Sequence, residues 1–130
     1  MEEQQLKELG TGALAFVGDA IYSLLVREKL AEVNRPSGEL HRLSVHYVRA
    51  GAQARVAAAL AGQLTEQEQA VFKRGRNLHT GSTPKNATEA EYHAATGLET
   101  LFGYLRLSGN DARVRQLFEA AWQLLSGEEF

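Results

Sequence analysis

The chain has 130 residues, of which 44% are hydrophobic and 23% charged, and its formal net charge is −2. This composition is typical of a globular protein with one hydrophobic core, so we expect a single domain that spans residues 1–130. The absence of cysteine excludes disulfides and thiolate metal sites, and the slight negative charge argues against indiscriminate binding to nucleic acid.

The N-terminal segment indicates a protein without a secretion signal. Residues 1–8 are polar and acidic, unlike a signal peptide, and no apolar run reaches the roughly 18 residues of a membrane helix. We therefore expect a cytoplasmic protein with no membrane partner.

Hydrophobic residues recur with helical spacing along nearly the whole chain, and no segment shows the alternation of a strand. The pattern predicts a helix from about Gly12 to Leu30 and a second, straight or bent, from about Ser37 to Ala61. Two capping boxes, at residues 65–68 and 88–91, predict helices that reach about Arg74 and about Leu107. A last helix carries a wide apolar stripe, which belongs to the core or to a subunit interface: Val114, Leu117, Phe118, Ala121, Trp122 and Leu125. The fold class is therefore all-α.

The polar residues of the predicted 37–61 helix fall on one of its faces: Arg42, His46, Arg49 and Gln53. They are expected to form the solvent-facing side of an amphipathic helix. A less favoured alternative is that they extend a surface that contacts RNA.

Two acidic residues are almost isolated in apolar helical segments. Asp19 is the only charged residue between residues 13 and 26, and Glu99 is the only acid between residues 92 and 105. An ionised carboxylate on a buried helix face costs several kcal/mol unless a cation, an opposite charge or hydrogen-bond donors offset it. Because no basic residue lies within one helical turn of either acid, we predict that both share a hydrated site that holds a cation.

Small residues next to the two acids support this prediction. Ala15 lies one turn before Asp19 and Gly103 one turn after Glu99, which predicts open space beside each carboxylate. Two further glycines are expected to let the two helices approach closely: Gly18 and Gly97. Two carboxylates with room for water suit Mg²⁺, with Mn²⁺ as a substitute, and such an ion activates water for attack on a phosphodiester. The alternative is that the acids cap a helix or pair in the core.

A basic segment without acids lies between Glu68 and Glu89, and its charges are Lys73, Arg74, Arg76 and Lys85. It includes a predicted loop at residues 75–87, which is long for a helix–helix connection and rich in Gly, Asn, Ser and Thr. Basic side chains together with such donors favour binding to phosphate groups. The alternative is a solvated loop without a ligand.

These motifs resemble those of a known family. Leu14-Ala-Phe-Val-Gly-Asp-Ala-Ile-Tyr22 resembles the signature helix of ribonuclease III catalytic domains, and Leu98-Glu-Thr-Leu-Phe-Gly-Tyr104 resembles their second acidic motif. Further segments are similar to the Mini-ribonuclease III group, in which the catalytic domain occurs alone: residues 35–43, 52–56, 74–77 and 84–86. The resemblance extends from about Leu14 to Leu107.

The chain departs from full-length ribonuclease III where that enzyme has additional acids. These positions are occupied by Gly12, Ala15 and Thr96. Mini-ribonuclease III also lacks these additional acids, so the departure supports the resemblance to that group. Fewer charged ligands should nevertheless weaken Mg²⁺ binding.

The resemblance implies a ribonuclease III endonuclease-domain-like helical bundle without a double-stranded-RNA-binding domain. It implies a homodimer that cleaves double-stranded RNA, leaves 5′-phosphate and 3′-hydroxyl ends, and matures the ends of the 23S rRNA precursor. Asp19 and Glu99 would be the catalytic, Mg²⁺-binding residues. The RNA would be bound by Lys73, Arg74, Arg76, Asn77, Lys85 and Asn86. Two alternatives remain: a catalytically inactive structured-RNA-binding module of the same fold, and a helical protein–protein adaptor.

Overall fold

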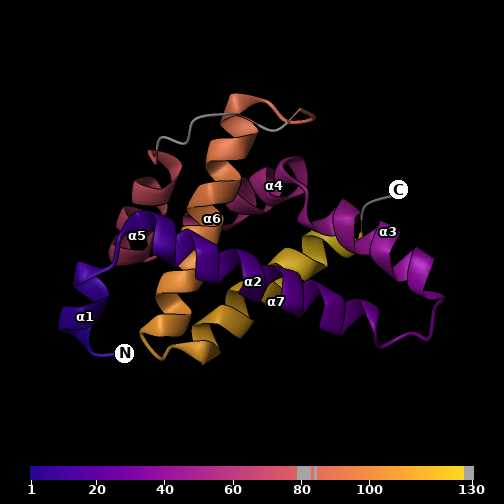
Figure 1. The fold of residues 1–130 in the computed structure, drawn as a ribbon, viewed down its shortest axis with the longest axis horizontal. Coiled ribbons are helices and arrows are strands. Elements are labelled where there is room, and N and C mark those ends of the chain that lie inside the picture. Colours follow the sequence, from indigo (N-terminus) through magenta and orange to yellow (C-terminus); the bar gives the residue numbers. More distant parts are fainter. Residues whose placement is uncertain (79–82, 84, 128–130) are drawn as a thin grey trace.

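The computed structural model describes residues 1–78, 83 and 85–127, and the described residues form a set of helices with no strand among them (Figure 1). The helices are α1 (Glu3–Glu8), α2 (Thr11–Leu30), α3 (Ser37–Val48), α4 (Ala50–Leu60), the 3₁₀ helix η1 (Ala61–Gln63), α5 (Glu66–Arg76), α6 (Glu89–Leu107) and α7 (Asp111–Ser126). The all-α prediction is confirmed. None of the helices described is long and apolar enough to cross a membrane.

Both predicted capping boxes begin helices. The side chain of Thr65 accepts a hydrogen bond from the Glu68 N–H, and the Glu68 carboxylate accepts one from the Thr65 N–H, at the start of α5. Thr88 and Glu91 form the same reciprocal pair at the start of α6. These bonds satisfy backbone donors that a helix start leaves without partners, so the boundaries follow from the local sequence.

The predicted 37–61 helix is two helices, α3 and α4, because the backbone at Arg49 is extended, with φ −61° and ψ 154°. The break changes the direction of the chain, so Arg42, His46, Arg49 and Gln53 do not form one solvent-facing side. Arg42 is exposed, whereas Gln53 is buried. Helix α1 was not predicted, and the buried side chain of Leu6 holds it to the rest of the molecule.

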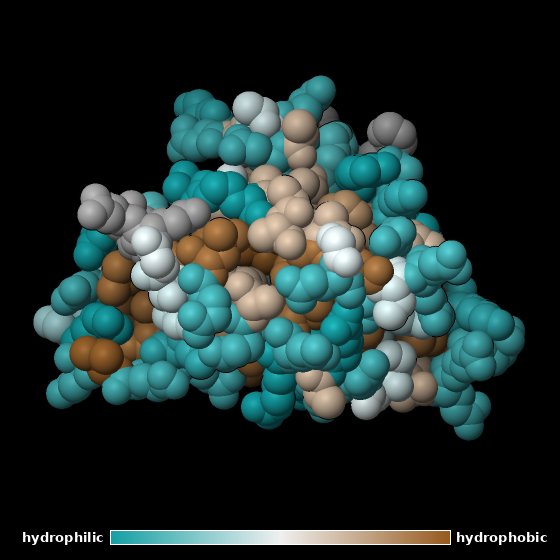
Figure 2. Space-filling view, turned by 180° about the vertical axis from the view of Figure 1, so that it is seen from behind, coloured by the Kyte–Doolittle hydropathy of each residue, from teal (hydrophilic) through white to brown (hydrophobic). Residues whose placement is uncertain are grey.

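Helix α6 lies at the centre of the fold and contacts α2, α4, α5 and α7. Figure 1 shows α2 crossing α6 near the middle of the molecule. From Ala95 to Leu105 nearly every residue of α6 is buried, as expected for a helix that neighbours surround on several sides. Figure 2 shows the opposite face, where hydrophobic residues are visible between hydrophilic side chains.

The predicted apolar stripe of α7 belongs to the core. Tyr22 contacts Phe102 and Phe118 edge to face, with ring centroids 5.4 and 5.7 Å apart. Trp122 is half-buried and lies 4.8 Å, centroid to centroid, from Tyr47 of α3. These aromatic contacts join α2, α3, α6 and α7 into one core.

A charged pair joins the start of α5 to α7. The Arg113 guanidinium donates hydrogen bonds to both carboxylate oxygens of Glu68, each at 2.9 Å, and a third to the Gln63 carbonyl at 2.8 Å. The ion pair is largely buried, and it holds the pKa of the Glu68 carboxyl below its usual range. This bidentate geometry is the strong form of an arginine–carboxylate contact.

Candidate active site

Helices α2 and α6 touch through their backbones at two glycines. A Cβ atom on Gly18 would lie 1.6 Å from the carbonyl oxygen of Glu99, and a Cβ atom on Gly103 would lie 1.9 Å from that of Leu14. Only glycine fits at either position, because the atoms in the way belong to backbone and cannot move aside. Since Asp19 directly follows Gly18, this contact brings the Asp19 carboxylate next to Glu99.

The structure corrects two predictions about small residues. Gly97 does not face α2: a Cβ there would lie 2.8 Å from the ring of Phe72, so Gly97 serves the contact of α6 with α5. The position of Gly103 is not open space, because the backbone of α2 occupies it. The close approach predicted from Gly18 is confirmed.

The two carboxylates lie in different environments. Asp19 is exposed, whereas Glu99 is largely covered by its neighbours. Burial, followed by the negative charge of Asp19, raises the pKa of Glu99 to about 8, and a hydrogen bond from Gln53 opposes this rise. At neutral pH and without a cation, Glu99 therefore retains a proton and can donate a hydrogen bond to Asp19.

This arrangement fits a hydrated divalent cation. A cation between the carboxylates would replace the proton on Glu99 and remove the repulsion between the two acids. Among the residues that the structure describes, no group of three or more His, Cys, Asp or Glu side chains could hold a metal ion. Water would therefore complete the coordination, which suits Mg²⁺ because this ion usually keeps several waters.

Two further side chains, those of Gln53 and Tyr22, lie next to Glu99. Gln53 of α4, only 3% exposed, donates a hydrogen bond from Nε2 to Glu99 Oε2 at 3.3 Å. Gln53 was predicted to lie on a solvent-facing side, but Val56, Ala57 and Leu60 continue the same helix stripe, and this apolar spacing indicates a buried position. Tyr22 is a core residue, and burial, followed by the charge of Glu99, raises the pKa of its hydroxyl.

The predicted RNA-binding residues lie in two groups, both of them exposed. Lys73, Arg74 and Arg76 belong to the last turns of α5, and Asn77 is its C-cap. Lys85 and Asn86 lie in the turn before α6. The predicted loop thus begins later than expected, since Gly75 is a buried residue of α5, and its residues 79–82 and 84 lie outside those described.

The basic end of α5 lies beside the helix that carries Glu99. A Cβ on Gly75 would lie 2.3 Å from Thr100 Oγ1 and 2.8 Å from the Gly97 Cα, so α5 contacts α6 on both sides of Glu99. Arg74 donates a hydrogen bond to Thr11 Oγ1 at 3.0 Å, which connects α5 to the start of α2. The exposed side chains of Lys73, Arg74 and Arg76 therefore form a basic surface at the end of α5, the helix that packs against α6.

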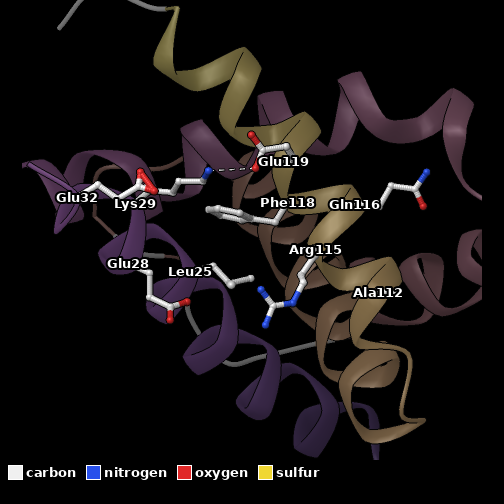
Figure 3. Close-up of a pocket in the computed structure, with 9 residues that line it drawn as sticks. All are labelled: Leu25, Glu28, Lys29, Glu32, Ala112, Arg115, Gln116, Phe118 and Glu119. Atoms are coloured by element: carbon white, nitrogen blue, oxygen red, sulfur yellow. Dashed lines mark ion pairs between the residues drawn. The ribbon is translucent and has the colours of Figure 1, made fainter.

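The carboxylate pair does not lie in the hollow between α2 and α7. That hollow has a volume of about 610 Å³, and its lining includes Leu25, Glu28, Arg115 and Phe118 (Figure 3). An ion pair between Lys29 Nζ and Glu119 Oε2, 3.1 Å long, lies at one side of it. None of the predicted site residues lines this hollow.

Comparison with known proteins identifies the family. The profile of the Ribonuclease III domain matches residues 12–110. The Mini-ribonuclease 3 of Symbiobacterium thermophilum is 47% identical over 109 residues, which cover 83% of this chain and 84% of that protein. The Mini-ribonuclease 3 of Enterococcus faecalis is 45% identical over 114 residues, which cover 85% of this chain and 86% of that protein. The crystal structure of protein FN1578 from Fusobacterium nucleatum superposes with a TM-score of 0.79 at 26% identity and covers 85% of each chain. The chain therefore belongs to the ribonuclease III family, among the endoribonucleases of the Mini-ribonuclease 3 group.

Proposed function

We propose that the chain is a Mg²⁺-dependent endoribonuclease that cleaves stems of double-stranded RNA in the cytoplasm, with the 23S rRNA precursor as its natural substrate. The observation that carries the proposal is the contact of α2 with α6, which brings the Asp19 carboxylate next to Glu99. Enzymes of this family generally act on double-stranded RNA as dimers and depend on a divalent metal.

Asp19 and Glu99 would hold the ion, directly or through water. Mg²⁺ bound there supplies an activated water and stabilises the negative charge that develops on the phosphodiester. Asp19 is exposed and so faces the side from which RNA can approach, whereas Glu99 lies behind it against α4. Glu99 must release its proton to bind the ion. Mn²⁺ also accepts carboxylate and water ligands, so we expect it to substitute.

The RNA would lie along the basic surface next to this pair. Lys73, Arg76 and Lys85 are exposed and supply positive charge, while the amides of Asn77 and Asn86 supply donors for phosphate or 2′-hydroxyl oxygens. Arg74 contributes charge from its position against Thr11. Contacts of this kind recognise the shape of an A-form helix more than its base sequence.

A homodimer is supported by an apolar stripe on the outer face of α2. Phe16 is 81% exposed and Leu24 is 54% exposed, and Ala20 lies between them on the same face. A stripe of this kind is costly to leave in water and is typical of an interface. Asp19 directly precedes Ala20, so a second subunit bound to this stripe would border the carboxylate pair. The two sites of the dimer would then lie along one RNA duplex, and each would cut one strand.

Gel analysis of a 3′-labelled precursor-rRNA stem and of a generic long duplex tests the proposal. We expect discrete products with 5′-phosphate ends in Mg²⁺ and none in EDTA. Asp19→Asn and Glu99→Gln, checked for folding by circular dichroism, should bind the RNA without cutting it. RNA that is retarded but uncut by the wild-type protein in Mg²⁺ would overturn the proposal in favour of a binding module.

A further inference from the structure

Gln53 is a polar side chain at a position where α4 otherwise presents hydrophobic ones. It begins the buried stripe that continues with Val56, Ala57 and Leu60, and it is itself only 3% exposed. Burying an amide costs about 1–3 kcal/mol unless hydrogen bonds compensate for the lost contact with water. Packing alone therefore does not account for glutamine at this position.

The amide nitrogen of Gln53 donates hydrogen bonds both to the end of α3 and to Glu99. Nε2 donates one hydrogen bond to the Val48 carbonyl at 2.9 Å and another to Glu99 Oε2 at 3.3 Å. Val48 ends α3, and a helix end leaves carbonyls without intrahelical partners. The bond to Val48 thus fixes the amide, and the second N–H is held towards Glu99.

The amide oxygen of Gln53 also indicates that this side chain does more than stabilise the fold. Gln53 Oε1 is buried and has no hydrogen-bond partner among the residues that the structure describes. Amides that serve only the fold rarely leave a buried oxygen in this state. The interactions that account for this side chain are therefore those of its nitrogen, with the Val48 carbonyl and with Glu99.

We propose that Gln53 is a positioning residue of the metal site, whose amide orients the Glu99 carboxylate so that it binds the cation together with Asp19. The inference rests on the proposed function, in which these two carboxylates hold Mg²⁺. Orientation matters here because the described residues provide no cluster of three or more acidic or histidine ligands that could compensate for one misplaced carboxylate. Loss of a hydrogen-bond partner of a metal ligand typically lowers metal affinity or activity by about 10–100-fold.

The test compares Gln53→Met with Val56→Ala. Methionine keeps the length and the buried apolar contacts of the side chain but cannot donate a hydrogen bond. Val56 is fully buried one turn further along the same stripe, so its truncation destabilises α4 without removing the donor to Glu99. The readouts are Mn²⁺ binding measured by electron paramagnetic resonance, the Mg²⁺ concentration for half-maximal cleavage, the KM for RNA, and the melting temperature in EDTA.

We expect Gln53→Met to weaken Mn²⁺ binding and raise the half-maximal Mg²⁺ concentration by roughly 10-fold or more, with the KM for RNA unchanged. Val56→Ala should lower the melting temperature and leave both metal measurements unchanged. Wild-type metal binding in Gln53→Met would overturn the inference. If Gln53→Met does not fold, Gln53→Asn replaces it: its amide is one methylene too short to reach both partners, so the same loss is expected and wild-type Mn²⁺ affinity would again overturn the inference. A wild-type protein that binds no Mn²⁺ and cuts no RNA would instead contradict the proposed function.

Discussion

Gly18 of α2 lies directly against the carbonyl oxygen of Glu99, so that a Cβ at Gly18 would stand 1.6 Å from this oxygen. The distance between the two acidic helices is thus set by the absence of a side chain. The same contact holds the fold together and places the two carboxylates, since Asp19 follows Gly18 in the chain. We therefore expect a change at Gly18 to affect both the stability of the fold and the arrangement of the two carboxylates.

Gly18→Ala should be strongly destabilising. The added methyl group meets backbone atoms that cannot move aside, so we expect a loss of at least about 3 kcal/mol in the free energy of unfolding, at the upper end of overpacking effects. Urea denaturation measures this loss. Gly38→Ala is the control: a Cβ there meets nothing within 4 Å, and the change should be neutral or stabilise α3 by up to about 1 kcal/mol. Equal stabilities of the two variants would contradict this account of the helix contact.

Local features of the sequence were sufficient to predict most of the helices. The capping boxes at Thr65 and Thr88 act within one helical turn, so the starts of α5 and α6 could be read directly. The helix over residues 37–61 was predicted as straight or bent, but the break at Arg49 was not located, because Gly51, two residues further on, does not by itself show whether a helix bends or ends there. Gln53 was misassigned for the same reason: its predicted face depended on a continuous helix.

The acid pair was easier to predict than its surroundings. Lone carboxylates in apolar helices indicate a shared site whatever the angle between the helices. The partners of individual glycines depend on that angle, so Gly97 was assigned to the wrong neighbour and the contact of Gly103 with α2 was not foreseen. Contacts between residues far apart in the sequence can therefore be assigned only once the packing of the helices is known.

Stability of the metal-free protein should fall as the pH rises from about 5 to 8. Burial and Asp19 raise the pKa of Glu99 to about 8 in the folded state, above the value near 4.5 of a free glutamate. The folded state therefore binds more protons than the unfolded state in this range, and the free energy of unfolding decreases with pH until Glu99 is ionised.

Urea denaturation in EDTA, repeated at about half-unit steps between pH 5 and pH 9, measures this dependence of the free energy of unfolding on pH. Glu99→Gln removes the titrating group, so its stability should vary less with pH over the same range. Added Mg²⁺ should stabilise the wild-type protein most at pH 8 and above, where it no longer competes with the proton. Parallel curves for the wild-type protein and Glu99→Gln would show that Glu99 does not titrate in this range.

Arg113→Met should destabilise the fold without changing the chemistry of the carboxylate pair. The substitution leaves Glu68 buried without its bidentate partner, which we expect to cost about 3 kcal/mol. The Glu68→Gln and Arg113→Met double variant should recover part of this loss, because no unpaired charge remains. Urea denaturation of the four proteins in the cycle gives the coupling energy, and a coupling energy near zero would contradict the assigned role of the pair.

Arg76→Ala and Lys85→Ala should each weaken RNA binding and lower the slope of log K against log salt concentration by about 1. Both side chains are exposed near the loop that joins α5 to α6. Arg106→Ala is a matched control, since Arg106 lies in the last turn of α6 and pairs with Asp111 at 3.5 Å. Filter binding of a duplex measures the slopes, in the background of Asp19→Asn, which we expect to bind the RNA without cutting it. An equal effect of Arg106→Ala would show that the charges act non-specifically.

We propose that Asp19 and Glu99 together hold the catalytic ion. The most direct measurement is the anomalous diffraction of Mn²⁺ in crystals of the wild-type protein and of Glu99→Gln. We predict a wild-type peak between the two carboxylates, at about 2.0–2.2 Å from their oxygens or one water molecule away, and its loss in Glu99→Gln. A wild-type protein that cleaves RNA in Mn²⁺ but binds the ion elsewhere, or a peak that persists unchanged in Glu99→Gln, would contradict the claim.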